Sequence, residues 1–364
     1  MSACVAILKT GNNKGKLCGK NVKEDTQYCG RHIGLLKTIN AVALESKAES
    51  LVEEIEEMKI SEPKKPKTKK TIKVFDYDDL SAVTQLLIET KNDTNYQIVK
   101  LIGKGAFGYV YLVNCLKNDI NYALKLTCVQ DNVSIRDKNL LYWENNLLTL
   151  HLMDCANVIK TAPIRPFINN DRFSYIILNY CEETLEDRIT NSAKRMSSTR
   201  IKQYGIGLIK TLKEIHRRKY IYIDIKPENI MFESSDSREP ILIDFGLTSL
   251  WKNVVGDHVQ QIPLNTDIGT PMFSSIFANS KQTPDRYGDL QSIGYLLLYM
   301  YNGKVPWHDI NRSSKILEAK KNIFDYDEFN KAPDYIKQFI KQTYNKQFGE
   351  NPDYRNLLKI LNDE

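Results

Sequence analysis

The pattern of hydrophobic and polar positions changes along the 364-residue chain, and beyond residue 75 it first favours strands. Three short runs, YQIVKLI, YVYLVNCL and NYALKLTCV, precede a helical stretch near 136–153, and the strand-like run FSYIILNY follows at 173–180. This part of the chain predicts a β-rich lobe of about residues 95–178 that contains one helix.

The rest of the chain has the periodicity of helices. Apolar residues recur every three or four positions from Ile201 to Ile215, behind the candidate helix caps Ser197 and Ser198. The apolar run SIGYLLLYMY at 292–301 has half the length of a membrane-spanning helix, so we interpret it as a buried core helix. The fold class that follows is α+β, with two lobes.

Two segments precede this domain, which we place at residues 75–364. Residues 1–33 are too few to build a core without a staple such as a metal. Residues 34–74 contain an apolar stripe at 43–60, which predicts an amphipathic helix that either packs on this protein or dimerises as a coiled coil. The stretch 61–73 contains two prolines, and six of its last ten residues are lysines, which is typical of a solvated linker.

Charge and cysteine content narrow the setting in which the protein works. The net charge of +6 is modest and largely local, so it does not by itself indicate nucleic acid. The lysines of the linker can nevertheless pair with phosphates, which leaves a nucleic-acid or nuclear-import patch as the alternative to a plain spacer. Seven scattered cysteines favour reduced thiols, and no secretory signal is visible, so we expect an intracellular protein without a membrane span, with a monomer favoured.

A glycine-rich run is the first candidate for chemistry. The sequence GKGAFGYV fits the spacing G-x-G-x-x-G-x-V, in which glycines let backbone N–H groups approach phosphates. Dinucleotide folds share this spacing but need a helix directly after the glycines, whereas a strand follows here. The candidate nucleotide-binding residues of this loop are Ile102, Gly103, Lys104, Gly105, Ala106, Phe107, Gly108 and Val110.

The next strand supplies a candidate phosphate anchor. Lys125 lies in YALKL, and strand alternation puts its two leucine neighbours on the opposite face, which leaves the lysine free to point into a cleft. The alternative is an ordinary surface lysine. Glu144 is the acidic residue within the apolar setting NLLYWENNLLTL of the following helix, and we predict that it forms an ion pair with Lys125.

The strongest motif is YIYIDIKPENIMF followed by ILIDFGL. Asp224 and Asn229 have the spacing D-x-x-x-x-N of a catalytic loop, and Asp244 begins the triplet D-F-G. Asp224 would act as the catalytic base for a substrate hydroxyl, and Lys226 would neutralise charge on the transferring phosphoryl group. Asn229 and Asp244 would hold Mg²⁺ through hard oxygen ligands.

On these residues the chain resembles the eukaryotic protein kinase superfamily over about residues 95–364. The runs GTPMFSSI, RYGDLQSIGYLLLYMYNGKVPW and PDYRNLLKIL are similar to the casein kinase 1 and vaccinia-related kinase group, which lacks the usual A-P-E triplet. The resemblance implies a bilobal kinase fold, ATP as cofactor and serine or threonine acceptors in protein substrates. It further implies that Thr270 contacts the catalytic aspartate, that Asp289 braces the catalytic loop, that Leu178 is the gatekeeper, and that Asn179 to Cys181 form the adenine-binding hinge.

Two departures fall in the triplet that is usually H-R-D and here is Tyr222-Ile223-Asp224. Tyr222 occupies a packing position. Ile223 replaces an arginine that usually pairs with a phosphorylated activation loop. We therefore expect activity that does not require phosphorylation of this loop.

The N-terminal segment carries a candidate zinc site formed by Cys4, Cys18, Cys29 and His32. Cys29 and His32 have the C-x-x-H spacing that closes tetrahedral zinc sites, although the thirteen residues between the first two cysteines exceed the usual spacing. Buried, unliganded cysteines are the alternative. The pattern resembles a small module of large DNA viruses, which implies a viral source and allows packaging in a virion.

Three functions fit these motifs. The first is an active serine/threonine kinase. The second is a pseudokinase scaffold, which usually has lost the lysine, a metal ligand or the base, and none of these is lost here. The third is a kinase that its first 73 residues tether to nucleic acid or to a virion.

Overall fold

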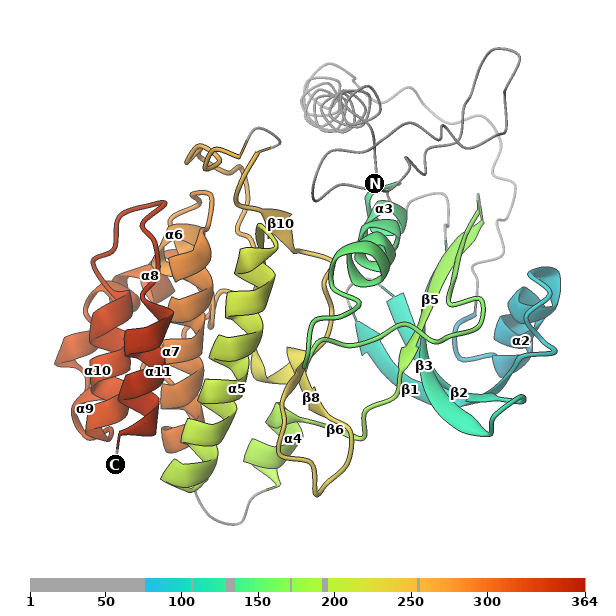
Figure 1. The fold of residues 1–364 in the computed structure, drawn as a ribbon, viewed down its shortest axis with the longest axis horizontal. Helices are drawn as coiled ribbons and strands as arrows, with labels where there is room; N and C mark the ends of the chain where they lie inside the picture. Colours follow the sequence, from blue (N-terminus) through green and yellow to red (C-terminus); the bar gives the residue numbers. More distant parts are fainter. Residues whose placement is uncertain are drawn as a thin grey trace, which may run out of the picture. The chain divides into compact units, whose positions relative to one another are not determined.

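The computed structural model describes residues 76–105, 108–128, 135–170, 172–191, 196–253 and 256–363. These residues form a β-rich lobe followed by a helical lobe, as the sequence pattern predicts (Figure 1). The candidate zinc site, the amphipathic stretch and the lysine-rich linker lie outside the described residues, as do Ala106 and Phe107.

The first lobe is built on a five-stranded antiparallel sheet with the strand order β1-β2-β3-β5-β4. Its inward side chains, among them Leu124 and Leu126, are almost fully buried. The helix expected near 136–153 is present as α3, which continues into a single π-helical turn. The elements of this lobe are β1 (Tyr96–Gly105), β2 (Gly108–Cys115), β3 (Ile120–Cys128), α3 (Ile135–Asn146), the π turn (Leu147–His151), β4 (Phe167–Asn169) and β5 (Phe173–Asn179).

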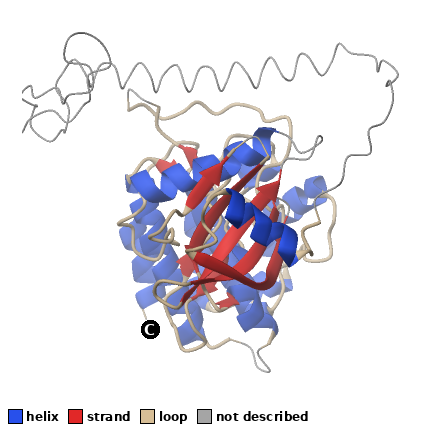
Figure 2. Cartoon of the chain, turned by 90° about the vertical axis from the view of Figure 1, so that its right-hand side faces the viewer, coloured by secondary structure: helices blue, strands red, loops and turns tan. Residues whose placement is uncertain are grey.

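A helix that we did not predict, α2 (Leu80–Glu89), lies against this sheet. Asp79 caps its first turn by accepting a hydrogen bond from the N–H of Ser81. Its apolar face packs into one core with strand residues; the buried helix residues are Val83, Leu86 and Leu87. Figure 2 faces this side and shows the helix across the strands.

The second lobe is a set of helices around two long central ones (Figure 1). Ser197 caps the long helix α5 by accepting from the N–H of Arg200, as its position in the sequence predicts. The run 292–301 lies in α7 and is buried along most of its length. The helices are α4 (Leu185–Thr190), α5 (Ser198–Arg217), α6 (Ile276–Asn279), α7 (Arg286–Asn302), α8 (Ser313–Lys321), α9 (Asp327–Asn330), α10 (Asp334–Thr343) and α11 (Tyr354–Asn362).

Short strands carry the loops that face the first lobe. They are β6 (Glu183–Thr184), β7 (Tyr220–Ile221), β8 (Ile230–Phe232), β9 (Ile241–Leu242) and β10 (Ser249–Leu250), with 3₁₀ turns at Pro227–Asn229 and Ile323–Asp325. In the part of the chain that the structure describes, no helix is long and apolar enough to cross a membrane. The cysteines described there as free thiols, Cys115, Cys155 and Cys181, are all buried.

Candidate active site

The predicted ion pair between β3 and α3 is present. Lys125 Nζ lies 2.9 Å from Glu144 Oε2 and also 2.9 Å from Asp244 Oδ1, so one ammonium group joins the sheet, the helix and the D-F-G segment. The other oxygen of Glu144 accepts a hydrogen bond of 3.0 Å from the N–H of Phe245. These contacts hold three separate elements at one point.

Burial and charge act against each other in this cluster. Burial alone would lower the pKa of Lys125, but attraction to Glu144 and Asp244 outweighs it and the pKa lies above its ordinary value. Burial raises the pKa of Glu144. Burial would also raise the pKa of Asp244, but the charge of Lys125 and its hydrogen bond keep that pKa below its ordinary value. Of the two carboxyl groups, Asp244 therefore has the lower pKa.

The glycine-rich run forms the hairpin between β1 and β2, with Gly105 paired to Gly108 and Gly103 to Val110. Gly108 has a φ of 139°, and a Cβ atom there would lie 2.2 Å from the carbonyl oxygen of Leu126. The chain at Gly108 can therefore approach the neighbouring strand only because this residue has no side chain.

The remaining candidates of the loop, Ile102 and Lys104, also lie on β1. Ile102 is 38% exposed, so its side chain can still be covered by a ligand. Lys104 forms an exposed ion pair of 2.9 Å with Asp78.

The second polar cluster surrounds Asp224 on the helical lobe. Its Oδ1 accepts hydrogen bonds from the N–H and the hydroxyl of Thr270, at 2.9 and 2.8 Å. Its Oδ2 accepts from the amide of Asn229 at 2.9 Å and lies 3.1 Å from Lys226 Nζ. Lys226 also donates to the hydroxyl of Thr270 at 3.1 Å. The side chain of Asp224 is 10% exposed, so its orientation is fixed while an edge stays accessible.

The two candidate Mg²⁺ ligands expose oxygen atoms that suit a hard cation. The amide nitrogen of Asn229 donates to two oxygens of Asp224, its carbonyl and Oδ2, which fixes the amide so that Oδ1 faces away from Asp224. Asp244 uses Oδ1 for Lys125, and its side chain is 28% exposed. Oxygen ligands of this kind fit Mg²⁺ when nucleotide phosphates and water complete the coordination. No group of three or more His, Cys, Asp or Glu side chains that could hold a metal occurs among the described residues.

Residues of the two central helices hold the catalytic loop in place. Asp289 of α7 accepts hydrogen bonds of 2.7 Å from the N–H groups of both Tyr222 and Ile223, which is the bracing role implied by the resemblance. His216 of α5 lies 2.8 Å from the same carboxylate and also contacts the hydroxyl of Tyr354 in α11. Sequence analysis missed His216, although a histidine within the apolar face of a helix is a visible signal.

Tyr222 and Ile223 take different roles. The ring of Tyr222 packs edge-on against the ring of Phe245 in D-F-G, with the ring centres 5.1 Å apart. Its hydroxyl donates to the carbonyl of Ile243. Tyr222 therefore has the packing role that was predicted for it. Ile223 has a φ of 78°, which is strained for a β-branched residue. Its side chain is buried in a small apolar cluster with Ile221 and Trp251.

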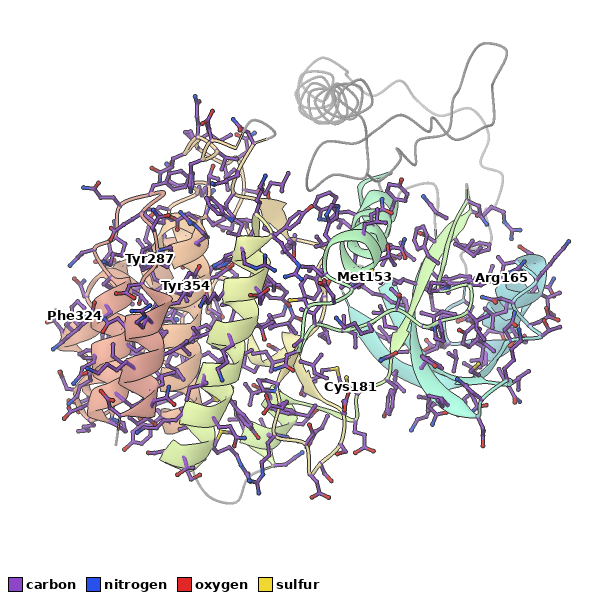
Figure 3. The ribbon with its side chains drawn as sticks, viewed as in Figure 1. Met153, Arg165, Cys181, Tyr287, Phe324 and Tyr354 are labelled. Carbon is purple, nitrogen blue, oxygen red and sulfur yellow. The ribbon has the colours of Figure 1, made fainter. Side chains whose placement is uncertain are left out.

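The predicted hinge lies where the chain passes from β5 to the helical lobe (Figure 3). Leu178 is buried at the end of β5, and the N–H of the exposed Asn179 donates to the carbonyl of Lys160 at 2.8 Å. The backbone groups of Cys181 have no hydrogen-bond partner within the described residues, which leaves them free for an adenine ring. Burial raises the pKa of the Cys181 thiol to about 11, so this thiol stays protonated at neutral pH.

These two lobes, with a lysine–glutamate pair on one and an aspartate–asparagine loop on the other, define a protein kinase. Comparison with known proteins gives the family: a model described as "Protein kinase domain" matches residues 96–360, and the chain belongs to that family. It is an ATP-dependent protein kinase.

Curated relatives show which group of protein kinases the chain is similar to. A casein kinase I homolog of Encephalitozoon cuniculi is 25% identical, over 73% of this chain and 84% of the relative. A serine/threonine-protein kinase of fowlpox virus is 26% identical, over 76% of this chain and 95% of the relative. The B1 kinase of vaccinia virus (strain Western Reserve) is also 26% identical, over 76% and 97%. These matches confirm the resemblance to the casein kinase 1 and vaccinia-related kinase group.

Proposed function

We propose that this kinase transfers the γ-phosphate of ATP to serine and threonine hydroxyls of protein substrates, with Asp224 as the catalytic base. The observation that carries the proposal is the carboxylate of Asp224, which accepts from Thr270 on one oxygen and from Asn229 on the other. These contacts fix the orientation of the carboxylate, and the Asp224 side chain is 10% exposed, so an edge stays accessible to an incoming hydroxyl. The names of the fowlpox relative and of a nematode relative, both serine/threonine kinases, support this choice of acceptor.

The roles of the other residues follow from their contacts. Lys226, between Asp224 and Thr270, would stabilise negative charge on the phosphoryl group as it moves. Lys125 would bind the phosphates of the nucleotide, with Glu144 fixing its position. Mg²⁺, held by Asn229 and Asp244, would neutralise the phosphate oxygens when bound. The glycine hairpin and the backbone near Cys181 would bind the two ends of ATP.

The test is phosphate transfer by purified protein from labelled ATP and Mg²⁺ to a mixture of acidic and basic acceptor proteins. The matched variant is Asp224→Asn, which keeps the size of the side chain. Loss of the base should lower the rate by roughly 10²- to 10⁴-fold, while the thermal midpoint changes little. Phosphoamino-acid analysis should find phosphoserine and phosphothreonine. Phosphotyrosine alone, or an Asp224→Asn variant with full activity, would contradict the proposal.

The pseudokinase alternative has less support, because the described residues keep the lysine in contact with one candidate metal ligand, Asp244, and the base in contact with the other, Asn229. The same assay separates the two functions. A pseudokinase would transfer no phosphate to any acceptor, and Asp224→Asn would then change nothing.

We further propose a structural zinc ion on Cys4, Cys18, Cys29 and His32. The support is the ligand chemistry alone: three thiolates and one imidazole form a typical tetrahedral set. Elemental analysis of the full-length protein should find one zinc per chain, which a Cys29→Ser, His32→Ala double variant should lose. A wild-type chain without zinc would refute the site.

For the cellular setting we propose an intracellular, virus-encoded kinase that its lysine-rich linker, residues 61–73, brings to nucleic acid. The poxvirus relatives support a viral source. Binding of the full chain to a DNA duplex should weaken steeply with added salt, and it should be lost when the linker lysines are replaced by glutamine. Binding that survives this replacement would contradict the role given to the linker.

A further inference from the structure

The segment that follows Thr270 is fixed by buried donors. The carbonyl of Thr270 accepts from the hydroxyl of Ser274 at 2.8 Å, and the carbonyl of Met272 accepts from the indole N–H of Trp307 at 2.7 Å. Thr270 itself is the residue whose N–H and hydroxyl hold Asp224. Whatever holds this segment in place therefore also acts on the position of Thr270.

Lys320, near the end of α8, supplies the remaining donors to this segment. Its Nζ lies 2.7 Å from the carbonyl oxygen of Pro271, 2.6 Å from that of Ser274 and 2.8 Å from Oδ1 of Asn279. The residue is 0% exposed. An ammonium group has three N–H donors, so these three oxygens use all of them.

The charge of Lys320 is balanced in an unusual way. No carboxylate of the described residues lies within ion-pair distance of it. Its Nζ instead lies 4.6 Å from the centre of the Tyr295 ring and 5.2 Å from that of the Trp307 ring, where the negative faces of the rings attract a cation. Burial lowers the pKa of Lys320 well below its ordinary value. The buried amino group of Lys320 is therefore stabilised by oxygen dipoles and ring faces rather than by a carboxylate, so its stabilisation depends on where these three oxygens lie.

We propose that Lys320 is a positioning residue for phosphate transfer, which holds the segment from Pro271 to Asn279 so that Thr270 keeps its contacts with Asp224. Lys320 does not touch the reacting groups. It acts through the backbone of the segment, which borders the place where an acceptor hydroxyl reaches Asp224. The proposal rests on the kinase function given above and adds a residue that acts on the same site from outside it.

The test combines Lys320→Met with Thr270→Ala in a double-mutant cycle on the full-length protein. Lys320→Met should lower kcat for an acceptor protein by roughly 10- to 100-fold, because small displacements of catalytic groups have effects of this size. Its affinity for ATP, measured by titration with a fluorescent nucleotide, should stay within about twofold, because the partners of this lysine described above all belong to the helical lobe and none is a hinge residue. Adding Lys320→Met to Thr270→Ala should lower kcat little below the value for Thr270→Ala alone.

Lys321→Met is the matched control, since this neighbouring lysine is exposed on the same helix. It should leave kcat unchanged. If Lys320→Met does not fold, Trp307→Phe serves instead, because it removes the donor to Met272 and keeps the buried ammonium group. It should also lower kcat in a way that does not add to Thr270→Ala.

Two results would overturn the proposal: effects of Lys320→Met or Trp307→Phe that multiply with that of Thr270→Ala, or an equal loss of ATP affinity and kcat. An inactive wild-type enzyme would instead refute the proposed function itself, so the two failures can be told apart.

Discussion

Each lobe contains a lysine that is largely or fully shielded from solvent, with 14% of the Lys125 side chain and 0% of Lys320 exposed, and the two lysines have opposite surroundings. On the β-rich lobe, Lys125 contacts two carboxylates, those of Glu144 and Asp244. On the helical lobe, Lys320 contacts two backbone carbonyls, one amide oxygen and two aromatic rings. The pKa of Lys125 is accordingly raised, and that of Lys320 is lowered.

The surroundings of Lys125 suit a lysine that binds a ligand, whereas those of Lys320 suit a lysine that holds a segment of the chain in place. The partners of Lys125 are ionised groups, and nucleotide phosphates are ionised groups as well, so the lysine can exchange one kind of partner for the other. The partners of Lys320 belong to the chain itself and cannot be exchanged unless the segment after Thr270 moves. The first lysine is expected to act on ATP, and the second on the geometry of the catalytic base.

Among the changes that test this comparison of the lobes, the largest expected effect comes from Lys125→Met. Removal of a cation that stabilises phosphates should lower kcat/KM by roughly 10²- to 10³-fold. The matched control is Lys100→Met, because Lys100 is an exposed lysine on strand β1 of the same sheet. Initial rates at varied ATP would measure both. A loss below tenfold, or an equal loss in the control, would show that Lys125 is not the anchor.

The second prediction in order of size concerns the glycine hairpin of the β-rich lobe. Gly108→Ala places a Cβ atom 2.2 Å from the carbonyl oxygen of Leu126, whereas Gly103→Ala places one at an ordinary 3.7 Å from Val110. Gly108→Ala should therefore lower the free energy of unfolding by roughly 1 to 3 kcal/mol more than Gly103→Ala does. Denaturation with urea would measure the difference. Equal values would mean that the hairpin adjusts without strain.

The pH dependence of stability should differ between wild type and Lys320→Met. A lysine with a lowered pKa binds its proton in the unfolded chain before it does so in the folded one. Below the ordinary value of 10.5, falling pH therefore favours unfolding of the wild type. The unfolding free energy of wild type minus that of the variant should rise as the pH rises toward 10.5, by at most about 1.4 kcal/mol per unit. Denaturation at several pH values would show this, and a flat difference would contradict the lowered pKa.

The smallest effect should come from phosphatase treatment. Ile223 lies in an apolar cluster with Trp251, where an arginine would otherwise need a phosphate partner. Activity after complete dephosphorylation, verified by mass spectrometry, should stay within about twofold. A collapse of activity would show that the helical half of the site is not fixed by packing alone.

Much of this arrangement could be predicted from the sequence because its signals are local. Alternating and three-to-four periodic apolar positions gave the strands and α5, together with its cap Ser197. The pairing of Lys125 with Glu144 followed from a motif and from a single acidic residue in the apolar stretch NLLYWENNLLTL. Asp289 followed from the family resemblance.

Other features depend on contacts between distant residues and carry no local signal. A lysine such as Lys320 is typical of a solvated surface, and its burial is decided by carbonyls 41 to 49 residues away. The positive φ of Ile223 follows from hydrogen bonds to α7. The helix α2 had a visible pattern in Val83, Leu86 and Leu87, but with ten residues it is short and precedes the first recognisable motif.

That helix has a practical consequence for anyone who trims the protein. The family match begins at Tyr96, yet three buried side chains of α2 belong to the same core as Tyr96 and Tyr111. A truncated chain that starts at the family boundary would expose the outer face of the β-rich lobe to water, and such faces promote aggregation. We therefore expect the shortest soluble kinase chain to begin before Asp79, which caps α2. The segment that the family model matches is shorter than the segment that shares this hydrophobic core.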